Sequence, residues 1–146
     1  MLIFNGPPTP QQLHQLGAII QLQVDAPAPI RQSLTAAGRA VPPTQLVSAL
    51  IDTGATVSGI DGAVLQALGL RPTGTVNIGG VAGPNAHGLY TVDIHIPFGL
   101  QRLSLANRVV IGVQLLPPYK ALLGRDLLAM MMLVYSGPAG TWTLAF

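Results

Sequence analysis

The residues best suited to chemistry lie in positions 48–56, where an apolar stretch ends in Asp52 and continues at once into Thr53 and Gly54. A carboxylate at such a position can take a proton from water or donate one during hydrolysis. Glycine has no Cβ, so the amide of Gly54 can approach the carboxylate closely. The tripeptide also suits an ordinary turn. The surrounding sequence is therefore needed to distinguish a catalytic aspartate from a turn residue.

Two later segments supply that context. Residues 121–128 read Ala-Leu-Leu-Gly-Arg-Asp-Leu-Leu, a buried-looking strand that ends in glycine and turns into a helix. Between this segment and Asp52, residues 76–83 are rich in glycine and precede an alternating run over 89–96, which predicts a strand. The glycine-rich segment could be an ordinary flexible hairpin, or a lid whose weak local packing lets it open.

These segments occur in the order in which the retropepsin family carries them, and the chain resembles a single-domain, bacterial-type member of that family. Retropepsins are retroviral-type aspartic proteases. The resemblance runs from about residue 17 to residue 146 and includes the C-terminal strand at 142–146. It implies an all-β fold: a retropepsin-like, closed, barrel-like domain with a flap hairpin and one or two short helices, acting as a symmetric homodimer. The implied activity is that of an aspartic endopeptidase.

The expected mechanism needs two carboxylates, one ionised and one protonated. Two carboxylates about 3 Å apart share a proton, because the doubly ionised pair is costly. The chain has five acidic residues, namely Asp25, Asp52, Asp61, Asp93 and Asp126, and Asp-Thr-Gly occurs only once. The second carboxylate must then come from another copy, and a two-fold dimer would place Asp52 beside its counterpart.

The resemblance also assigns roles to individual residues. It makes Asp52 catalytic, and it implies that Thr53 and Gly54 support the active-site turn, with Thr53 reaching across the dimer. An extended polypeptide substrate would bind by strand addition. The implied substrate-binding residues are Ala55, Thr56, Ile78, Gly79, Gly80 and Val81, and the implied structural residues near the site are Leu123, Gly124, Arg125 and Asp126.

The chain departs from the family pattern after Ala55. Viral members often carry acidic residues there, one of which pairs with the arginine that corresponds to Arg125. This chain has Thr56 and Val57 instead. The partner of Arg125 is left open between Asp126, another aspartate and main-chain carbonyls. The neutral residues favour apolar side chains in the substrate pockets.

Composition bounds the remaining possibilities. The chain has 146 residues, 49% of them hydrophobic and only 8% charged, which is enough for one domain with a core. The scarce charge fits a large subunit contact. Seven scattered basic residues and five acidic ones give a net charge of +2, so no nucleic-acid partner is expected. The histidines show no metal spacing, and no metal or cofactor is implied.

The apolar runs are too short and too often interrupted for a membrane span. No signal peptide is evident, and these two observations together favour a cytoplasmic location. A membrane-surface protein is disfavoured because no basic amphipathic helix is present. The main alternative is a non-cleaving peptide-binding or assembly module of the same fold, although the intact Asp-Thr-Gly argues against it.

The expected elements position these groups. Residues 1–16 read as an N-terminal extension, in which 2–4 could add an edge or interface strand, and 17–146 form the protease domain. Strands are predicted over 20–25 and 45–51, with a loop or broad hairpin over 27–43. Asp61 and Asp126 are predicted to cap short helices over 62–69 and 127–132. Asp25 and Asp93 lie in alternating strands and are expected to face solvent rather than to act in catalysis.

Overall fold

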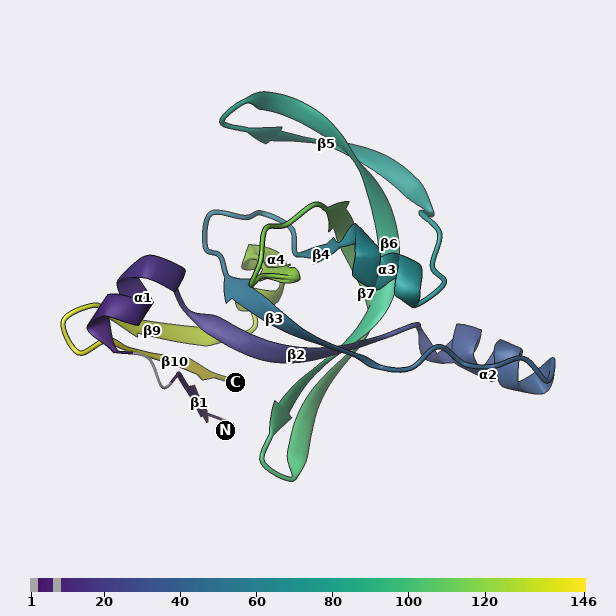
Figure 1. Cartoon of the computed structure of the whole chain (residues 1–146), viewed down its shortest axis with the longest axis horizontal. Helices are drawn as coiled ribbons and strands as arrows, with labels where there is room; N and C mark the ends of the chain where they lie inside the picture. The colour runs from purple at the N-terminus through teal and green to yellow at the C-terminus, as the bar shows by residue number, and fades with distance from the viewer. Residues whose placement is uncertain (1–2, 7–8) are drawn as a thin grey trace.

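The computed structural model describes residues 3–6 and 9–146, and its main feature is a closed β-barrel (Figure 1). The strands of the larger sheet are β2 (Ile19–Asp25), β3 (Gln45–Ile51), β4 (Gly59–Asp61), β5 (Gly74–Gly80), β6 (Gly83–Phe98), β7 (Gln101–Val113) and β8 (Ala121–Leu123). Their order is β2-β3-β8-β4-β7-β6-β5. A further pairing of β2 with β6 closes the barrel and leaves β5 outside it. The all-β, barrel-like expectation is confirmed.

A smaller sheet joins the two ends of the chain. It consists of β1 (Ile3–Asn5), β10 (Thr141–Ala145) and β9 (Met132–Ser136), in that order and all antiparallel. The expected C-terminal strand is therefore present as β10. Leu2, which was expected to contribute to an N-terminal edge strand, lies outside the described residues. The start of β1 and the end of β10 lie side by side, since Ile3 pairs with Ala145 (Figure 1).

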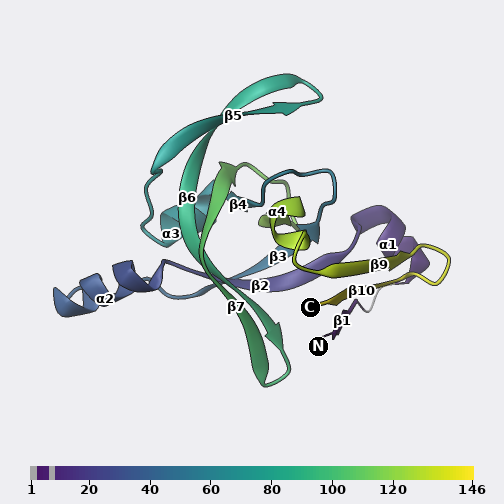
Figure 2. The same cartoon turned by 180° about the vertical axis from the view of Figure 1, so that it is seen from behind.

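The helices in the described part of the chain are α1 (Pro10–Leu16), α2 (Ala28–Ala36), α3 (Gly62–Ala67) and α4 (Arg125–Leu128). The prediction of a loop or hairpin over 27–43 was wrong at α2. Its proline lies in the first turn, where the missing N–H costs no helical hydrogen bond. Helix α2 extends sideways from the barrel (Figures 1 and 2). No helix in 3–6 or 9–146 is both long enough and apolar enough to cross a membrane.

The barrel interior follows from the alternation of side chains along each strand. On β2, for example, Ile20, Leu22 and Val24 are buried in the core. Asp25 and Asp93 face the opposite side of the sheet, but the expectation that they face solvent was wrong, since they are only 6% and 3% exposed. They lie opposite each other in the β2–β6 pairing, where side chains and amides from neighbouring segments cover and bind them.

Asp61 caps α3 as predicted, since its Oδ1 accepts a hydrogen bond of 3.0 Å from the amide of Ala63. Its Oδ2 accepts another of 3.1 Å from the amide of Leu115, and Lys120 Nζ lies 3.4 Å from Oδ1. Burial raises the pKa of Asp61, but these amides and the lysine outweigh burial and hold the pKa below its ordinary value. Asp61 is therefore a structural carboxylate.

The prediction that Asp126 caps a helix over 127–132 was wrong. The helix is α4, Arg125–Leu128, and its N-cap is Gly124, so that Asp126 lies inside the first turn. The Asp126 carboxylate does not cap the helix. Its Oδ1 instead accepts hydrogen bonds from the backbone amide and the hydroxyl of Ser58. A contact between residues so far apart in the chain leaves no local signal in the sequence.

Candidate active site

Strand β3 delivers Asp52 to the end of the barrel. Ile51 pairs in parallel with Leu123 of β8, and the amide of Asp52 then donates to the carbonyl of Leu123 over 3.0 Å. On the other side, the amide of Ile51 donates to the carbonyl of Ala18 over 2.9 Å. Both neighbours hold the strand up to its last residue. The half-buried carboxylate of Asp52 therefore has a well-defined position at the point where the chain leaves the sheet.

The turn that follows binds one oxygen of this carboxylate. The amide of Gly54 donates to Asp52 Oδ1 over 2.9 Å, and the amide of Ala55 donates to the Asp52 carbonyl over 3.2 Å. A Cβ on Gly54 would lie 3.1 Å from Oδ1, so a side chain there would crowd the carboxylate. Among the described residues, no hydrogen bond reaches Asp52 Oδ2. One oxygen thus orients the group, while the other remains available to water or to a second carboxyl group.

A buried serine clamps the far end of the Asp52 loop, which we define as residues 52–58. The amide and hydroxyl of Ser58 donate to Asp126 Oδ1 over 3.0 and 2.7 Å, and the amide of Gly124 donates to Ser58 Oγ over 2.9 Å. Sequence reasoning missed Ser58. The only signal was a hydroxyl just before the short strand β4, and its partner is 68 positions away.

Gly124 is required at this clamp by close approach rather than by its backbone angles. A Cβ built on it would lie 2.8 Å from the carbonyl carbon of Val57 and 2.9 Å from the amide nitrogen of Ser58. Both are backbone atoms, which cannot rotate away as a side chain would. The glycine therefore lets α4 pack directly against the Asp52 loop.

Arg125 ties α4 to the middle of the same loop. Its Nη2 donates to Thr56 Oγ1 over 2.9 Å, and its amide donates to the carbonyl of Ala55 over 2.9 Å. The threonine hydroxyl is a different partner from the three that the sequence left open. Because a neutral hydroxyl replaces a carboxylate, this contact is a single hydrogen bond without an ion pair.

The expected flap residues lie on the hairpin formed by β5 and the start of β6. Gly80 pairs with Gly83, so that Val81 and Ala82 form the turn, and the Val81 side chain is fully exposed. Strand β5 pairs only with β6 within the described sheet. The hairpin extends from the barrel on the same side as the Asp52 loop (Figures 1 and 2). Among the described residues, no hydrogen bond joins its tip, residues 78–81, to that loop.

The structure therefore brings together Asp52, Thr53, Gly54, Ala55, Thr56, Leu123, Gly124, Arg125 and Asp126, all within or against one loop. Thr53, Gly54 and Thr56 are exposed, so these residues are accessible to another molecule. Across the described ranges, no group of three or more His, Cys, Asp or Glu side chains is arranged to hold a metal ion.

We compared the sequence and the structure of this chain with those of known proteins. No family profile and no curated protein sequence matches this chain. Among solved structures, a retropepsin-like aspartic protease from Rickettsia conorii is similar over 99% of this chain and 92% of its own, with 14% identity and a TM-score of 0.50.

Two viral proteins also match, over smaller shares of this chain. The Simian Foamy Virus (mac) protease is 17% identical, covers 77% of this chain and 92% of its own, and has a TM-score of 0.45. The EIAV protease complexed with the inhibitor HBY-793 is 23% identical, covers 58% of this chain and 76% of its own, and has a TM-score of 0.38. The closed barrel together with the near full-length match shows that this chain has a retropepsin-like fold.

Proposed function

We propose that the protein is an aspartic endopeptidase in which two Asp52 residues, one from each subunit of a homodimer, activate water. The observation that carries the proposal is the state of Asp52. Its carboxylate lies just after β3 in a loop that residues 123–126 hold in place, with Oδ1 bound by the amide of Gly54 and no described hydrogen bond on Oδ2. The retropepsin-like fold supports the same conclusion.

The chemistry follows from pairing two such groups. One carboxylate is ionised and takes a proton from water, while the other is protonated and donates to the scissile carbonyl or to the leaving amine. At a separation of about 3 Å the two share one proton, which belongs to the pair rather than to either residue. A single chain supplies one Asp52, so the catalytic unit is the homodimer.

Exposed apolar side chains support association. Met130, Met132, Val134 and Tyr135 are all exposed, on the segment that directly follows α4. Met132 and Val134 share one face of β9, because side chains alternate along a strand. In a chain with only 8% charged residues, such an exposed apolar face is suited to being covered by a second copy. The segment continues from the helix that braces the Asp52 loop, so contact here would bring the two loops near each other.

The proposed substrate is a polypeptide in extended conformation. Within the described sheet, β5 pairs only with β6, which leaves its other edge free. The tip of this hairpin is rich in glycine, with Ile78, Gly79, Gly80 and Val81 near its turn. An extended peptide can pair with such backbone groups, and pockets then read alternate side chains. We assign the hairpin the role of a flap that covers bound peptide.

The first experiment measures cleavage of a diverse peptide library, from acidic to neutral pH, by wild type and Asp52→Asn. We expect the variant to lose activity by about 10²–10⁴-fold or more, while light scattering shows the same dimer. Full activity in the variant would sink the assignment. Peptide binding without cleavage by either protein would favour the non-cleaving module instead.

A mixing experiment tests whether the site is shared between subunits. Wild type and Asp52→Asn are combined at constant total concentration and allowed to exchange. If each site needs both aspartates, activity falls with the square of the wild-type fraction, to about a quarter in an equal mixture. A linear fall, to half, would show that each chain acts alone. Mixing with Ser33→Ala, an exposed change on α2, is the matched control and should leave activity unchanged.

A further inference from the structure

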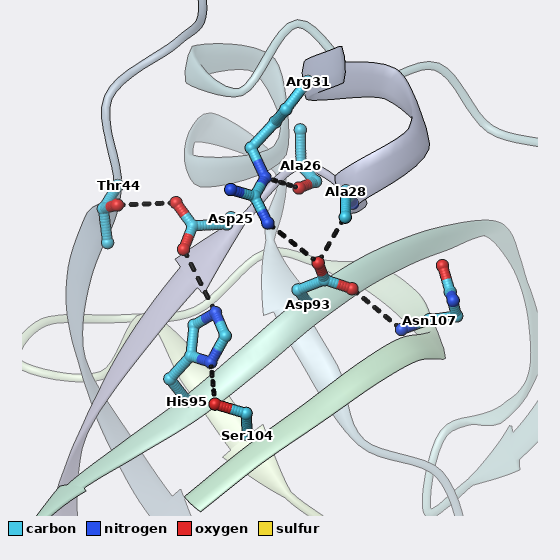
Figure 3. Close-up of polar contacts among 9 residues, drawn as sticks. All are labelled: Asp25, Ala26, Ala28, Arg31, Thr44, Asp93, His95, Ser104 and Asn107. Atoms are coloured by element: carbon cyan, nitrogen blue, oxygen red, sulfur yellow. Dashed lines mark hydrogen bonds and ion pairs between the residues drawn. The ribbon is translucent and has the colours of Figure 1, made fainter. Parts of the chain in front are cut away.

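A second group of chemically capable side chains lies on the outer face of the barrel, and Figure 3 shows its members together. Asp25 comes from β2, His95 from β6 and Ser104 from β7. His95 Nε2 lies 3.2 Å from Asp25 Oδ2, and His95 Nδ1 lies 2.8 Å from Ser104 Oγ. His95 and Ser104 are directly opposite each other in the β6–β7 pairing. The backbone register therefore sets the serine against the imidazole.

The partners of His95 determine which ring nitrogen carries its proton. An ionised carboxylate can only accept, so the nitrogen facing Asp25, Nε2, is the donor. Nδ1 is then the acceptor and takes a hydrogen bond from the Ser104 hydroxyl. Thr44 Oγ1 donates to the other oxygen of Asp25 over 2.6 Å, which fixes the carboxylate. The resulting order is serine, base and carboxylate, with the two ring nitrogens exchanged relative to the familiar triad.

The imidazole is held in the neutral form that a base requires. Burial lowers the pKa of His95, and the positive charges of Arg102 and Arg31 lower it further. Together they outweigh Asp25 and Asp93, which raise it. His95 is only 6% exposed.

Exposure differs between the three members of the group. Asp25 is 6% exposed, as buried as His95, but Ser104 is exposed at the surface. The base and its carboxylate are shielded, whereas Ser104 lies on the exposed surface of β7. A nucleophile bonded to a base that a third group orients is the arrangement of an activated serine.

We propose that Ser104, His95 and Asp25 form a second, serine-hydrolase-type centre that accepts acyl groups from small carboxylic esters. Ser104 Oγ forms a bond to the acyl carbon as its proton passes to His95 Nδ1. The bond from that carbon to the leaving alkoxide breaks, and the alkoxide takes the proton from Nδ1. Water then attacks the acyl-serine by the same route and releases the carboxylic acid.

Arg102 supplies a positive charge for the oxyanion that forms in each step. It lies two residues before Ser104 on β7 and so shares the same face of the strand, and its charge acts on His95. Because Ser104 lies on the exposed surface of strand β7, the centre is restricted to small or activated acyl donors. This centre is independent of the proposed dyad, since none of its residues belongs to the Asp52 loop.

A purely structural network would contain the same hydrogen bonds without reactivity, and covalent labelling separates the two cases. The probe is an alkyl fluorophosphonate: the P–F bond breaks, Oγ–P forms, fluoride leaves and His95 takes the serine proton. We expect one adduct, mapped to Ser104 by peptide mass spectrometry. It should be absent in Ser104→Ala, slower by about 10²–10⁴-fold in Asp25→Asn, and unchanged in Ser33→Ala, which alters an exposed serine on α2.

The pH profile adds a readout that a structural role would not move. Labelling should rise with pH along a single titration whose midpoint lies below the ordinary value for histidine of about 6.5, and 4-nitrophenyl acetate hydrolysis should follow the same curve. Near-UV circular dichroism checks that each variant folds. Absence of a Ser104 adduct on wild type at any pH from acidic to neutral overturns the proposal, whether or not Asp25→Asn folds. Equal labelling rates in wild type and a folded Asp25→Asn variant overturn it too.

Discussion

The carboxylates of Asp52 and Asp93 have opposite environments, although one directly follows a strand of the barrel and the other lies within a strand of the same barrel. Asp93 Oδ1 accepts from the amide of Asn107 over 2.8 Å, and its Oδ2 accepts from the amide of Ala28 over 3.1 Å and from Arg31 over 3.3 Å. The group is 3% exposed. Asp52 is half-buried and has one described hydrogen bond on Oδ1 and none on Oδ2.

The position of each carboxylate relative to its strand explains why only one of them remains free to react. Asp93 lies within a long strand and is covered by α2, so its lone pairs must be satisfied by protein groups. Asp52 lies just beyond the last residue of β3, where the pairing of that strand with β8 ends. Asp93 therefore stabilises the fold, whereas Asp52 is positioned by the fold and keeps one oxygen available for reaction.

Removal of Asp93 should have the largest effect on stability. Asp93→Ala leaves the amides of Ala28 and Asn107 and the Arg31 guanidinium without their acceptor, and we expect the free energy of unfolding to fall by about 2–3 kcal/mol. Asp52→Asn should change it by less than about 0.5 kcal/mol. Urea denaturation measures both. Similar losses in the two variants would contradict the contrast between a structural and an available carboxylate.

A change at Gly124 should disturb the Asp52 loop from behind. In Gly124→Ala the new Cβ must push back the backbone of Val57 and Ser58, and we expect a loss of about 1–3 kcal/mol with a fall in peptide cleavage larger than the loss of folded protein. Gly137→Ala is the control, since nothing lies within 4 Å of the corresponding Cβ. Equal behaviour of the two variants in thermal unfolding and cleavage would show that the close approach is not needed.

Ser58→Ala tests the clamp itself with a smaller change. It removes the hydroxyl that bridges Gly124 and Asp126 but keeps the backbone bond from Ser58 to Asp126, so we expect a loss of about 1 kcal/mol. Cleavage should fall because the loop that carries Asp52 is less well fixed. Denaturation and kinetics on the same samples provide the measurement. An unchanged kcat, with stability lowered, would restrict Ser58 to a purely structural role.

The pH dependence of stability should show two separate windows. The pKa of His95 is lowered, so the unfolded chain binds more protons, and stability should fall as the pH drops below about 6.5 toward the folded pKa. The pKa of Asp61 is also lowered, and its contribution should be lost only as the pH falls below about 4. Denaturation of His95→Gln across this range should lack the upper window. If the variant retains it, another group is responsible.

Local features of the fold were predictable from the sequence. The strand over 45–51 was predicted with the bounds that β3 has, and the strand predicted over 20–25 differs from β2 by one residue at its start. Asp61 was identified as a helix cap. Each rests on alternation or on capping, which depend on residues only a few positions apart.

Helix α2 and the buried aspartates were not predictable in the same way. The prolines around α2 look like helix breakers until one of them is placed in the first turn. Asp25 and Asp93 alternate with core residues and so look solvent-facing. They become buried only because the β2–β6 pairing sets them side by side and other segments cover them.

Three features followed from the sequence alone: the strand that ends at Ile51, the turn residues around Asp52 and the order of segments that predicts a retropepsin-like fold. These depend on side-chain periodicity and on glycine at a tight turn, which are properties of short stretches. Only the tertiary structure decided that Ser58 joins Asp126, that Thr56 receives Arg125 and that His95 stands between Asp25 and Ser104. Closure of the barrel creates these contacts between distant residues, and no local pattern encodes the strand register that sets their geometry.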